Sequence, residues 1–308
     1  METVTLEIQE KPILAPPAKG FLNLREKTAA YAALTKPRIA LMLVLTAAAG
    51  FYLGTIGKFD WVLFANSLFG IALLALGVAT LNQVIERETD VLMKRTATRP
   101  LPTGQLTTAQ ALIFGVLLST AAEIYLAVFV NPLTALLGLS VIVGYVLLYT
   151  PLKTKTSLST VIGAFPGAMP PLMGWTAAAG EITIPAWVLF AILFFWQFPH
   201  FLAIAWMYRT EYAKAGILML PVVEPSGRLT AQQIVVFSLI LGPISLAPFF
   251  IGLDGWVYLA GASGLGLWFV WESIKFARTK TDLQARKLLR VSVIYLPLLF
   301  LLAVLNKQ

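Results

Sequence analysis

Residues 61–104 read WVLFANSLFGIALLALGVATLNQVIERETDVLMKRTATRPLPTG, and two opposite compositions meet within them. The first part, Trp61–Leu81, carries no charged side chain and is long enough to cross a bilayer, which takes about 20 helical residues. The second part, Asn82–Gly104, mixes acidic, amide and basic side chains. The stretch therefore predicts a membrane-spanning helix that ends in a charged loop at the membrane boundary.

Eight further apolar runs of similar length occur along the chain. They do not alternate polar and apolar residues as outer-membrane strands do, so we expect helices. The predicted fold class is an all-α polytopic membrane protein. Its nine predicted transmembrane helices are Ile39–Gly57, Trp61–Leu81, Ala109–Val130, Pro132–Tyr149, Val161–Ala179, Pro185–Met207, Ile234–Leu253, Trp256–Phe276 and Leu288–Leu305.

The composition of the whole chain agrees with this class. Of its 308 residues 58% are hydrophobic and 12% are charged, whereas soluble proteins carry about 25% charged residues. So few charges exclude a cytosolic enzyme, a secreted module and a disordered chain. Without cysteine, and with a single histidine, the chain also lacks the residues for disulfides, thiolate metal sites or multi-histidine metal centres.

The basic residues fall into alternate loops, which predicts the orientation of the helices because cytoplasmic loops are rich in lysine and arginine. Of the 23 basic residues, 21 lie in the amino-terminal region and in every second loop, which we therefore place in the cytoplasm. The two others are Lys58 and Lys307. We expect the amino terminus inside, the carboxyl terminus outside, and the protein in the cell (inner) membrane.

Residues 1–38 are polar and mixed in charge, and they lack the apolar core and cleavage site of a signal peptide. We expect residues 1–30 to be a largely disordered cytoplasmic tail and residues 31–308 to be a single transmembrane domain. The formal net charge of +8 then serves membrane insertion, so we expect no nucleic-acid partner.

The loop after Leu81 is the first candidate site. Asn82, Glu86 and Asp90 are spaced four apart, so they share one face if the helix continues, and Glu88 would approach from the flank. Carboxylate and amide oxygens are ligands for Mg²⁺, which often bridges substrate phosphates. The basic residues that follow, Lys94, Arg95 and Arg99, can bind phosphate oxygens. The alternative is a solvated loop whose acids and bases offset one another.

Two more polar patches lie at cytoplasmic helix ends. Trp196–Gly216 carries His200, Tyr208, Arg209, Glu211 and Lys214, and Tyr149–Trp175 offers Lys153, Lys155 and several hydroxyls. The first of these patches comes four helices after Asn82–Gly104, which suggests two halves with facing sites. An intramembrane histidine is a functional hypothesis by default. His200 could be a structural hydrogen-bonding residue, a contact to substrate or iron, or a proton-transfer group.

Several motifs together resemble the UbiA superfamily of intramembrane prenyltransferases, over roughly residues 30–305. Asn82-x3-Glu86-Arg87-Glu88-x-Asp90 is similar to its first aspartate-rich motif, with glutamates at 86 and 88 where the family has aspartates. The segments RTATRPL, YTPLK, GAFPGAMPPLMGW and WQFPHF resemble the members that prenylate haem. Glu211 is followed by Ala215 where the wider superfamily has a second aspartate, so Arg209 or Lys214 could replace it toward phosphate.

The resemblance implies a reaction between farnesyl diphosphate and haem b that gives haem o and diphosphate. It implies Mg²⁺ bound by Asn82, Glu86, Glu88 and Asp90, and a catalytic set of Asn82, Glu86, Asp90 and Glu211. It also implies a cytoplasmic active site and a partner such as haem A synthase or an oxidase-assembly protein. The residues expected to bind diphosphate are Lys94, Arg95, Arg99, Lys153, Arg209 and Lys214, and His200 is expected to contact haem.

Two other functions stay open at this point. Another member of the superfamily could prenylate an aromatic ring for quinone synthesis. A secondary transporter is the rival from a different class, but transporters tend to place ionisable residues at the bilayer midplane. Here these residues cluster at one boundary.

Overall fold

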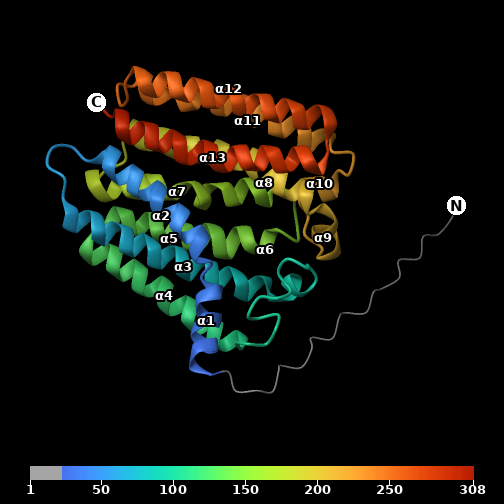
Figure 1. Ribbon diagram of the computed structural model, residues 1–308. Coiled ribbons are helices and arrows are strands. Elements are labelled where there is room, and N and C mark those ends of the chain that lie inside the picture. The colour runs from blue at the N-terminus through green and yellow to red at the C-terminus, as the bar shows by residue number, and fades with distance from the viewer. Residues whose placement is uncertain (1–22) are drawn as a thin grey trace.

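The computed structural model describes residues 23–308, and helices form its framework (Figure 1). Within that range the only β-type pairing is a single bridge between Asp254 and Lys307. The helices are α1 (Leu24–Leu34), α2 (Pro37–Gly54), α3 (Trp61–Val91), α4 (Thr108–Phe129), α5 (Pro132–Ile142), the π-helix η1 (Val143–Tyr149), α6 (Thr150–Leu152), α7 (Ser159–Ala179), α8 (Ile184–Met207), α9 (Arg209–Lys214), α10 (Leu220–Val223), α11 (Arg228–Phe250), α12 (Trp256–Thr279) and α13 (Asp282–Asn306).

Each of the nine predicted segments falls in helical structure, but seven stretches are long and apolar enough to cross a membrane. The two others, α7 and α12, have 21 and 24 residues and contain more glycine and polar or aromatic residues. Most of α7 is buried against neighbouring helices, so it needs little of the aliphatic surface that lipid requires. The structure supports seven candidate membrane spans, and the predicted number of nine transmembrane helices is not confirmed. The seven are Pro37–Gly54, Trp61–Val91, Thr108–Phe129, Pro132–Leu152, Ile184–Met207, Arg228–Phe250 and Asp282–Asn306.

The described part of the predicted amino-terminal tail is helical. Residues 1–22 lie outside the described residues, but α1 begins at Leu24, inside the predicted tail. Asn23 accepts a hydrogen bond from the Glu26 amide, and the Glu26 carboxylate accepts one from the Asn23 amide, at 2.9 Å each. This capping box stabilises the first turn of the helix. The expectation of disorder is therefore wrong from residue 23 to residue 30.

The long helices pack side by side in a bundle. Figure 1 shows α11, α12 and α13 on one side and α3, α4 and α5 on the other, with α2, α7 and α8 between them. The helices α2 and α7 cross closely because both carry glycine at the crossing. A Cβ on Gly50 would collide with the Pro171 carbonyl, and one on Gly174 would collide with the Ala47 carbonyl. The two largest apolar clusters lie one on each side of the bundle, and α2 and α7 contribute to both.

Candidate active site

A cavity of about 1160 Å³ lies between α2, α3, α7, α8 and α13. Most of its wall is apolar, and polar side chains gather at one end. Some apolar wall residues on α2 and α13 are also exposed, among them Leu45 and Leu301, so the cavity reaches the apolar surface of the bundle. The charged and amide residues of the polar end and its surroundings are Lys36, Arg38, Asn82, Glu86, Asp90, Arg95, Arg99, Lys153 and Gln197.

The polar end exists because α3 continues beyond its apolar run. The helix ends at Val91, so Asn82, Glu86 and Asp90 lie one above the other on a single face, as their spacing predicts. All three line the cavity, and Asn82 and Asp90 are only 1% exposed. Buried carboxylates require partners, because an uncompensated charge away from water is costly.

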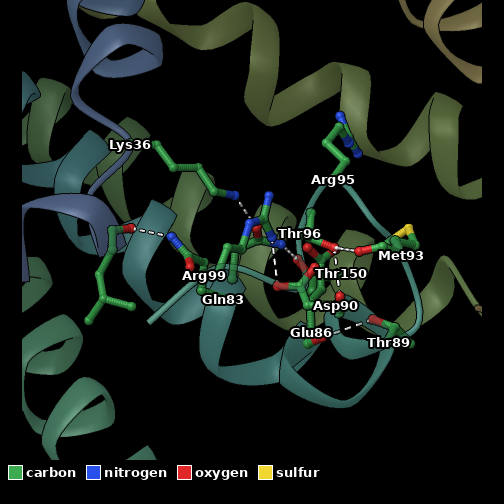
Figure 2. A network of polar contacts seen from close by, with 12 residues as sticks. Lys36, Gln83, Glu86, Thr89, Asp90, Met93, Arg95, Thr96, Arg99 and Thr150 are labelled. Atoms are coloured by element: carbon green, nitrogen blue, oxygen red, sulfur yellow. Dashed lines mark hydrogen bonds and ion pairs between the residues drawn. The ribbon is translucent and has the colours of Figure 1, made fainter. Parts of the chain in front are cut away.

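Each of these three side chains has a cationic partner from another segment. The Lys36 ammonium donates to Asn82 Oδ1 at 2.7 Å, and the Lys153 ammonium lies 2.5 Å from Glu86 Oε1. The Arg99 guanidinium lies 2.6 Å from Asp90 Oδ2. Figure 2 shows Glu86, Asp90 and Arg99 gathered in this network, with Lys36 reaching in from the start of α2. The polar end is therefore a compact set of alternating charges.

The two lysines differ in their electrostatic environment. Burial, and then the nearby Arg99, lowers the pKa of Lys36 to about 8. Burial alone would also lower the pKa of Lys153, but the Glu86 carboxylate beside it outweighs that effect and raises the pKa well above its usual value. Lys153 is therefore a permanent cation at physiological pH.

The α3 face fits a magnesium ion by its donor chemistry. Residues 23–308 contain no group of three or more acidic, histidine or cysteine side chains close enough to hold a metal. Magnesium, however, commonly uses one or two carboxylates and completes its shell with water and substrate phosphates. Asp90 Oδ1 is buried and has no hydrogen-bond partner among the described residues, so one oxygen is free for a cation. Glu86 and Asn82 supply the other candidate oxygens.

Glu88 does not join this face. Its side chain is 71% exposed and pairs with Arg87 at 3.0 Å, because a residue two positions from Glu86 points to a different side of the helix. The structure therefore places Glu88 away from Asn82, Glu86 and Asp90, and its role as a metal ligand stays a prediction from the sequence.

The predicted diphosphate-binding residues divide into two groups. Arg95, Arg99 and Lys153 line the cavity. Lys94 and Lys214 are exposed and lie outside its wall. Arg209 is also outside, because its guanidinium pairs with Asp282 at 2.8 Å and donates to the Trp206 carbonyl. The structure thus places Lys94, Lys214 and Arg209 outside the cavity wall, and their contacts to diphosphate stay predictions from the sequence.

The loop after α3 contacts α9 across the polar end, which brings the first two predicted patches together. The backbone amide of Arg95 donates to Glu211 Oε2 at 3.4 Å, and the Arg95 guanidinium donates to the Tyr212 hydroxyl at 3.2 Å. The same guanidinium stacks on Tyr208, 5.0 Å from the ring centre. Glu211 itself does not line the cavity. Its carboxylate binds the backbone amide of Arg95, so Glu211 is a positioning residue for the loop after α3.

His200 lines the cavity from α8. Its Nδ1 lies 2.8 Å from the Ser292 hydroxyl, and its ring stacks on Trp196 at 4.6 Å. The Trp196 indole donates to the Ser292 carbonyl at 2.8 Å, which fixes the stack against α13. The second ring nitrogen, Nε2, makes no hydrogen bond to the described residues.

Sequence reasoning missed two parts of the polar end. In the sequence Lys36 is one of several basic residues of the amino-terminal region, although it directly precedes α2 and its side chain reaches Asn82. Tyr145 was assigned to an apolar run, although it lines the cavity from η1. The available signal was the spacing of Tyr145, Tyr149 and Lys153, which are four residues apart on one segment.

Comparisons with known proteins identify the relatives of this chain. The model of the UbiA prenyltransferase family matches residues 43–302. The chain is 47% identical to a protoheme IX farnesyltransferase of Solibacter usitatus, over 90% of this chain and 98% of that protein. It is 44% identical to a protoheme IX farnesyltransferase of Koribacter versatilis, over 96% and 97% of the two chains.

Two solved structures share the fold at low sequence identity. A UbiA homologue from Aeropyrum pernix K1 superposes with a TM-score of 0.71 at 16% identity, over 88% of this chain and 98% of its own. A UbiA homologue from Archaeoglobus fulgidus, bound to DMAPP and Mg²⁺, superposes with a TM-score of 0.65 at 17% identity. It covers 89% of this chain and 99% of its own length.

Proposed function

The chain belongs to the UbiA prenyltransferase family, and on that premise we propose that it transfers a farnesyl group from farnesyl diphosphate to a vinyl group of haem b, giving haem o. One observation carries the proposal: the amide and carboxylates of α3 lie at the polar end of a large apolar cavity. Such a cavity suits a diphosphate head at one end and an apolar chain beyond it. The names of the similar proteins supply the haem substrate.

Asn82, Glu86 and Asp90 would hold magnesium, which when bound neutralises the diphosphate and assists its departure. Glu88 is not part of this set because it is exposed. Lys153, Arg99 and Arg95 line the same end and bind the diphosphate oxygens by charge-assisted hydrogen bonds. The Archaeoglobus homologue, with its bound DMAPP and Mg²⁺, supports this assignment.

In the proposed reaction the bond between C1 of farnesyl and its oxygen breaks, and the electron pair leaves with diphosphate. The resulting allylic cation lies between apolar helices that keep water away from it. The haem vinyl group supplies the electrons of the new carbon–carbon bond. Water then adds to the cation beside the porphyrin ring and loses a proton, which leaves a hydroxyethylfarnesyl substituent.

We further propose nine crossings, with α7 and α12 added to the seven candidate spans. At about 1.5 Å per residue, 21 and 24 helical residues extend over about 30 Å or more, which matches the hydrocarbon core. Both helices also pack along spanning neighbours (Figure 1). With nine crossings, the distribution of basic residues supports a cytoplasmic amino terminus and a cytoplasmic polar end. The proposed location is the inner membrane.

Chromatography of the haems extracted from cells that express the protein tests the function. We expect a new haem, more hydrophobic than haem b, whose mass has increased by one farnesyl group and one hydroxyl group. Cells that express the Asp90→Ala variant at the same level provide the control. If haem b stays unchanged while a prenylated quinone precursor accumulates, the haem assignment is wrong and the quinone alternative holds.

His200 is proposed to serve the haem substrate. It lines the cavity from α8, and its Nε2 is available as an iron ligand or hydrogen-bond partner. We expect His200→Ala to weaken haem binding or slow haem prenylation about tenfold, while farnesyl diphosphate binding, measured without haem, stays within twofold. Titration of purified protein with each substrate gives both values.

Two variants separate this role from a structural one. Ser292→Ala removes the side-chain partner of Nδ1 but keeps the imidazole in place, so it should affect haem binding less than His200→Ala does. Normal haem affinity and turnover in His200→Ala would show that the histidine is structural. Loss of farnesyl diphosphate binding instead would place it on the prenyl side.

A further inference from the structure

The one π-helix in the described part of the chain lies beside the polar end of the cavity. The helix η1 spans Val143–Tyr149 and interrupts the α-helical run between α5 and α6. Such wide turns are rare and occur frequently at functional sites. Two tyrosines of this segment, Tyr145 and Tyr149, line the cavity. None of the steps described above uses them.

The register between η1 and α3 gives the level of Tyr145 in the cavity. Lys153 contacts Glu86 and Thr150 contacts Asn82, which are sequence separations of 67 and 68. The same separations place Tyr145 level with residues 77–78. Val78 lies one helical turn, about 6 Å, before Asn82 on the apolar side. Tyr145 also packs against the apolar cluster that contains Val78.

The position of the reacting carbon follows from the diphosphate site. In the proposed function the diphosphate binds at Asn82, Glu86 and Asp90, so C1 of the prenyl group would lie just on the apolar side of Asn82. That is the level of Tyr145. The backbone there is fixed: the Thr150 hydroxyl donates to the Tyr145 carbonyl at 2.7 Å and accepts from the Asn82 amide at 3.2 Å.

The two tyrosines are not equivalent. The Lys153 ammonium lies over the Tyr149 ring, 4.4 Å from its centre, so that ring already contacts a cation. Tyr145 meets Tyr149 edge to face, with centroids 4.9 Å apart. Its hydroxyl makes no hydrogen bond to residues 23–308. Tyr145 therefore presents an aromatic ring, without a fixed polar partner, at the apolar level where cationic charge develops.

We propose that the Tyr145 ring is a catalytic group that stabilises the allylic cation by a cation–π interaction. The bond from C1 to oxygen breaks, its electron pair leaves with diphosphate, and the π-face of Tyr145 attracts the positive charge until the haem vinyl group attacks. The ring forms no bond and transfers no proton. Such contacts gain strength in a desolvated site. The inference rests on the proposed farnesyl transfer.

Stepwise fluorination of the ring tests the proposal. Position 145 is replaced by phenylalanine and by its mono-, di- and trifluoro analogues, which keep the ring shape but weaken its π-face. We expect the rate of farnesyl transfer to fall steadily along the series, by about tenfold from phenylalanine to trifluorophenylalanine. Tyr145→Leu should lose about tenfold or more in kcat. The KM for farnesyl diphosphate should change less than threefold.

Tyr125 provides the matched control. It lies on α4 outside the cavity wall, where its hydroxyl donates to Asn66 at 2.8 Å. The same series at position 125 should give a flat rate. A flat series at position 145, on a protein whose wild type makes haem o, would overturn the role of Tyr145 and leave the proposed function intact.

A second readout does not involve haem. Without an acceptor, slow hydrolysis of farnesyl diphosphate to farnesol reports the same bond cleavage. We expect the fluorination series to lower this rate in parallel. If the wild type cleaves farnesyl diphosphate but never alkylates haem, the proposed acceptor is wrong. The hydrolysis series then still decides whether Tyr145 stabilises the cation.

Discussion

Replacing Asp90 with alanine is expected to lower turnover by about a thousandfold or more while the protein stays folded in the membrane. Asp90 is buried, lines the cavity and has one carboxylate oxygen without a partner. A metal ion supplies several kcal/mol of charge stabilisation, and each 1.36 kcal/mol corresponds to tenfold in rate. Steady-state assays of the purified variant at saturating magnesium measure the loss. Glu86→Ala should give a similar result, because Glu86 lies one turn away on the same face.

The neighbouring Glu88 is a matched control for these variants. It carries the same charge two positions from each of them, but its side chain is exposed and pairs with Arg87. Glu88→Ala should therefore keep turnover within about twofold, because an exposed ion pair contributes little. Near-normal activity of Asp90→Ala would show that the Asp90 carboxylate is not a ligand of the metal. Loss of activity in Glu88→Ala would show that the site extends around the helix.

The sequence alone predicted the part of the site that lies on one continuous helix. The four-residue spacing of Asn82, Glu86 and Asp90 implies one face, and α3 continues far enough to produce it. The same periodicity already indicated that Glu88 lies on the flank. What periodicity could not show is whether the Glu88 side chain bends back toward the face. Its pairing with Arg87 decides that question.

The other parts depend on contacts between segments distant in sequence. Lys36 reaches Asn82 across 46 residues, and no local pattern marks it as different from the other basic residues before α2. Arg209 was expected to face phosphate, but Asp282, 73 residues away, holds it outside the cavity. Nor does the apolar run from residue 132 to 149 reveal that its end forms a π-helix or that Tyr145 in this π-helix lines the cavity.

The number of spans shows a second limit of sequence reasoning. Hydropathy measures how well a segment suits lipid, but α7 is surrounded by other helices. Its glycines and its three internal prolines permit close packing with α2, where a Cβ on Gly174 would not fit. Glycine and other small residues let a helix inside a bundle pack closely against its neighbours, and the same residues lower its mean hydropathy. Length and neighbours, rather than hydropathy, support its assignment as a crossing.

Removal of magnesium is expected to abolish activity completely and reversibly. The candidate ligands Asn82, Glu86 and Asp90 all bind through oxygen, and oxygen ligands favour magnesium or manganese over softer metals. Dialysis against a chelator should therefore stop farnesyl transfer, and added Mg²⁺ should restore it, whereas Zn²⁺ should not. The assay is haem prenylation by purified protein at defined free metal concentrations.

A cationic site could in principle bind diphosphate without metal, since Lys153, Arg99 and Arg95 line the same end of the cavity. However, Lys153 and Arg99 are already paired with Glu86 and Asp90, so much of their charge is compensated. The polar end therefore needs an additional cation to neutralise the diphosphate as its negative charge increases. Full activity in metal-stripped protein would contradict this reasoning, and the basic residues would then have to act alone.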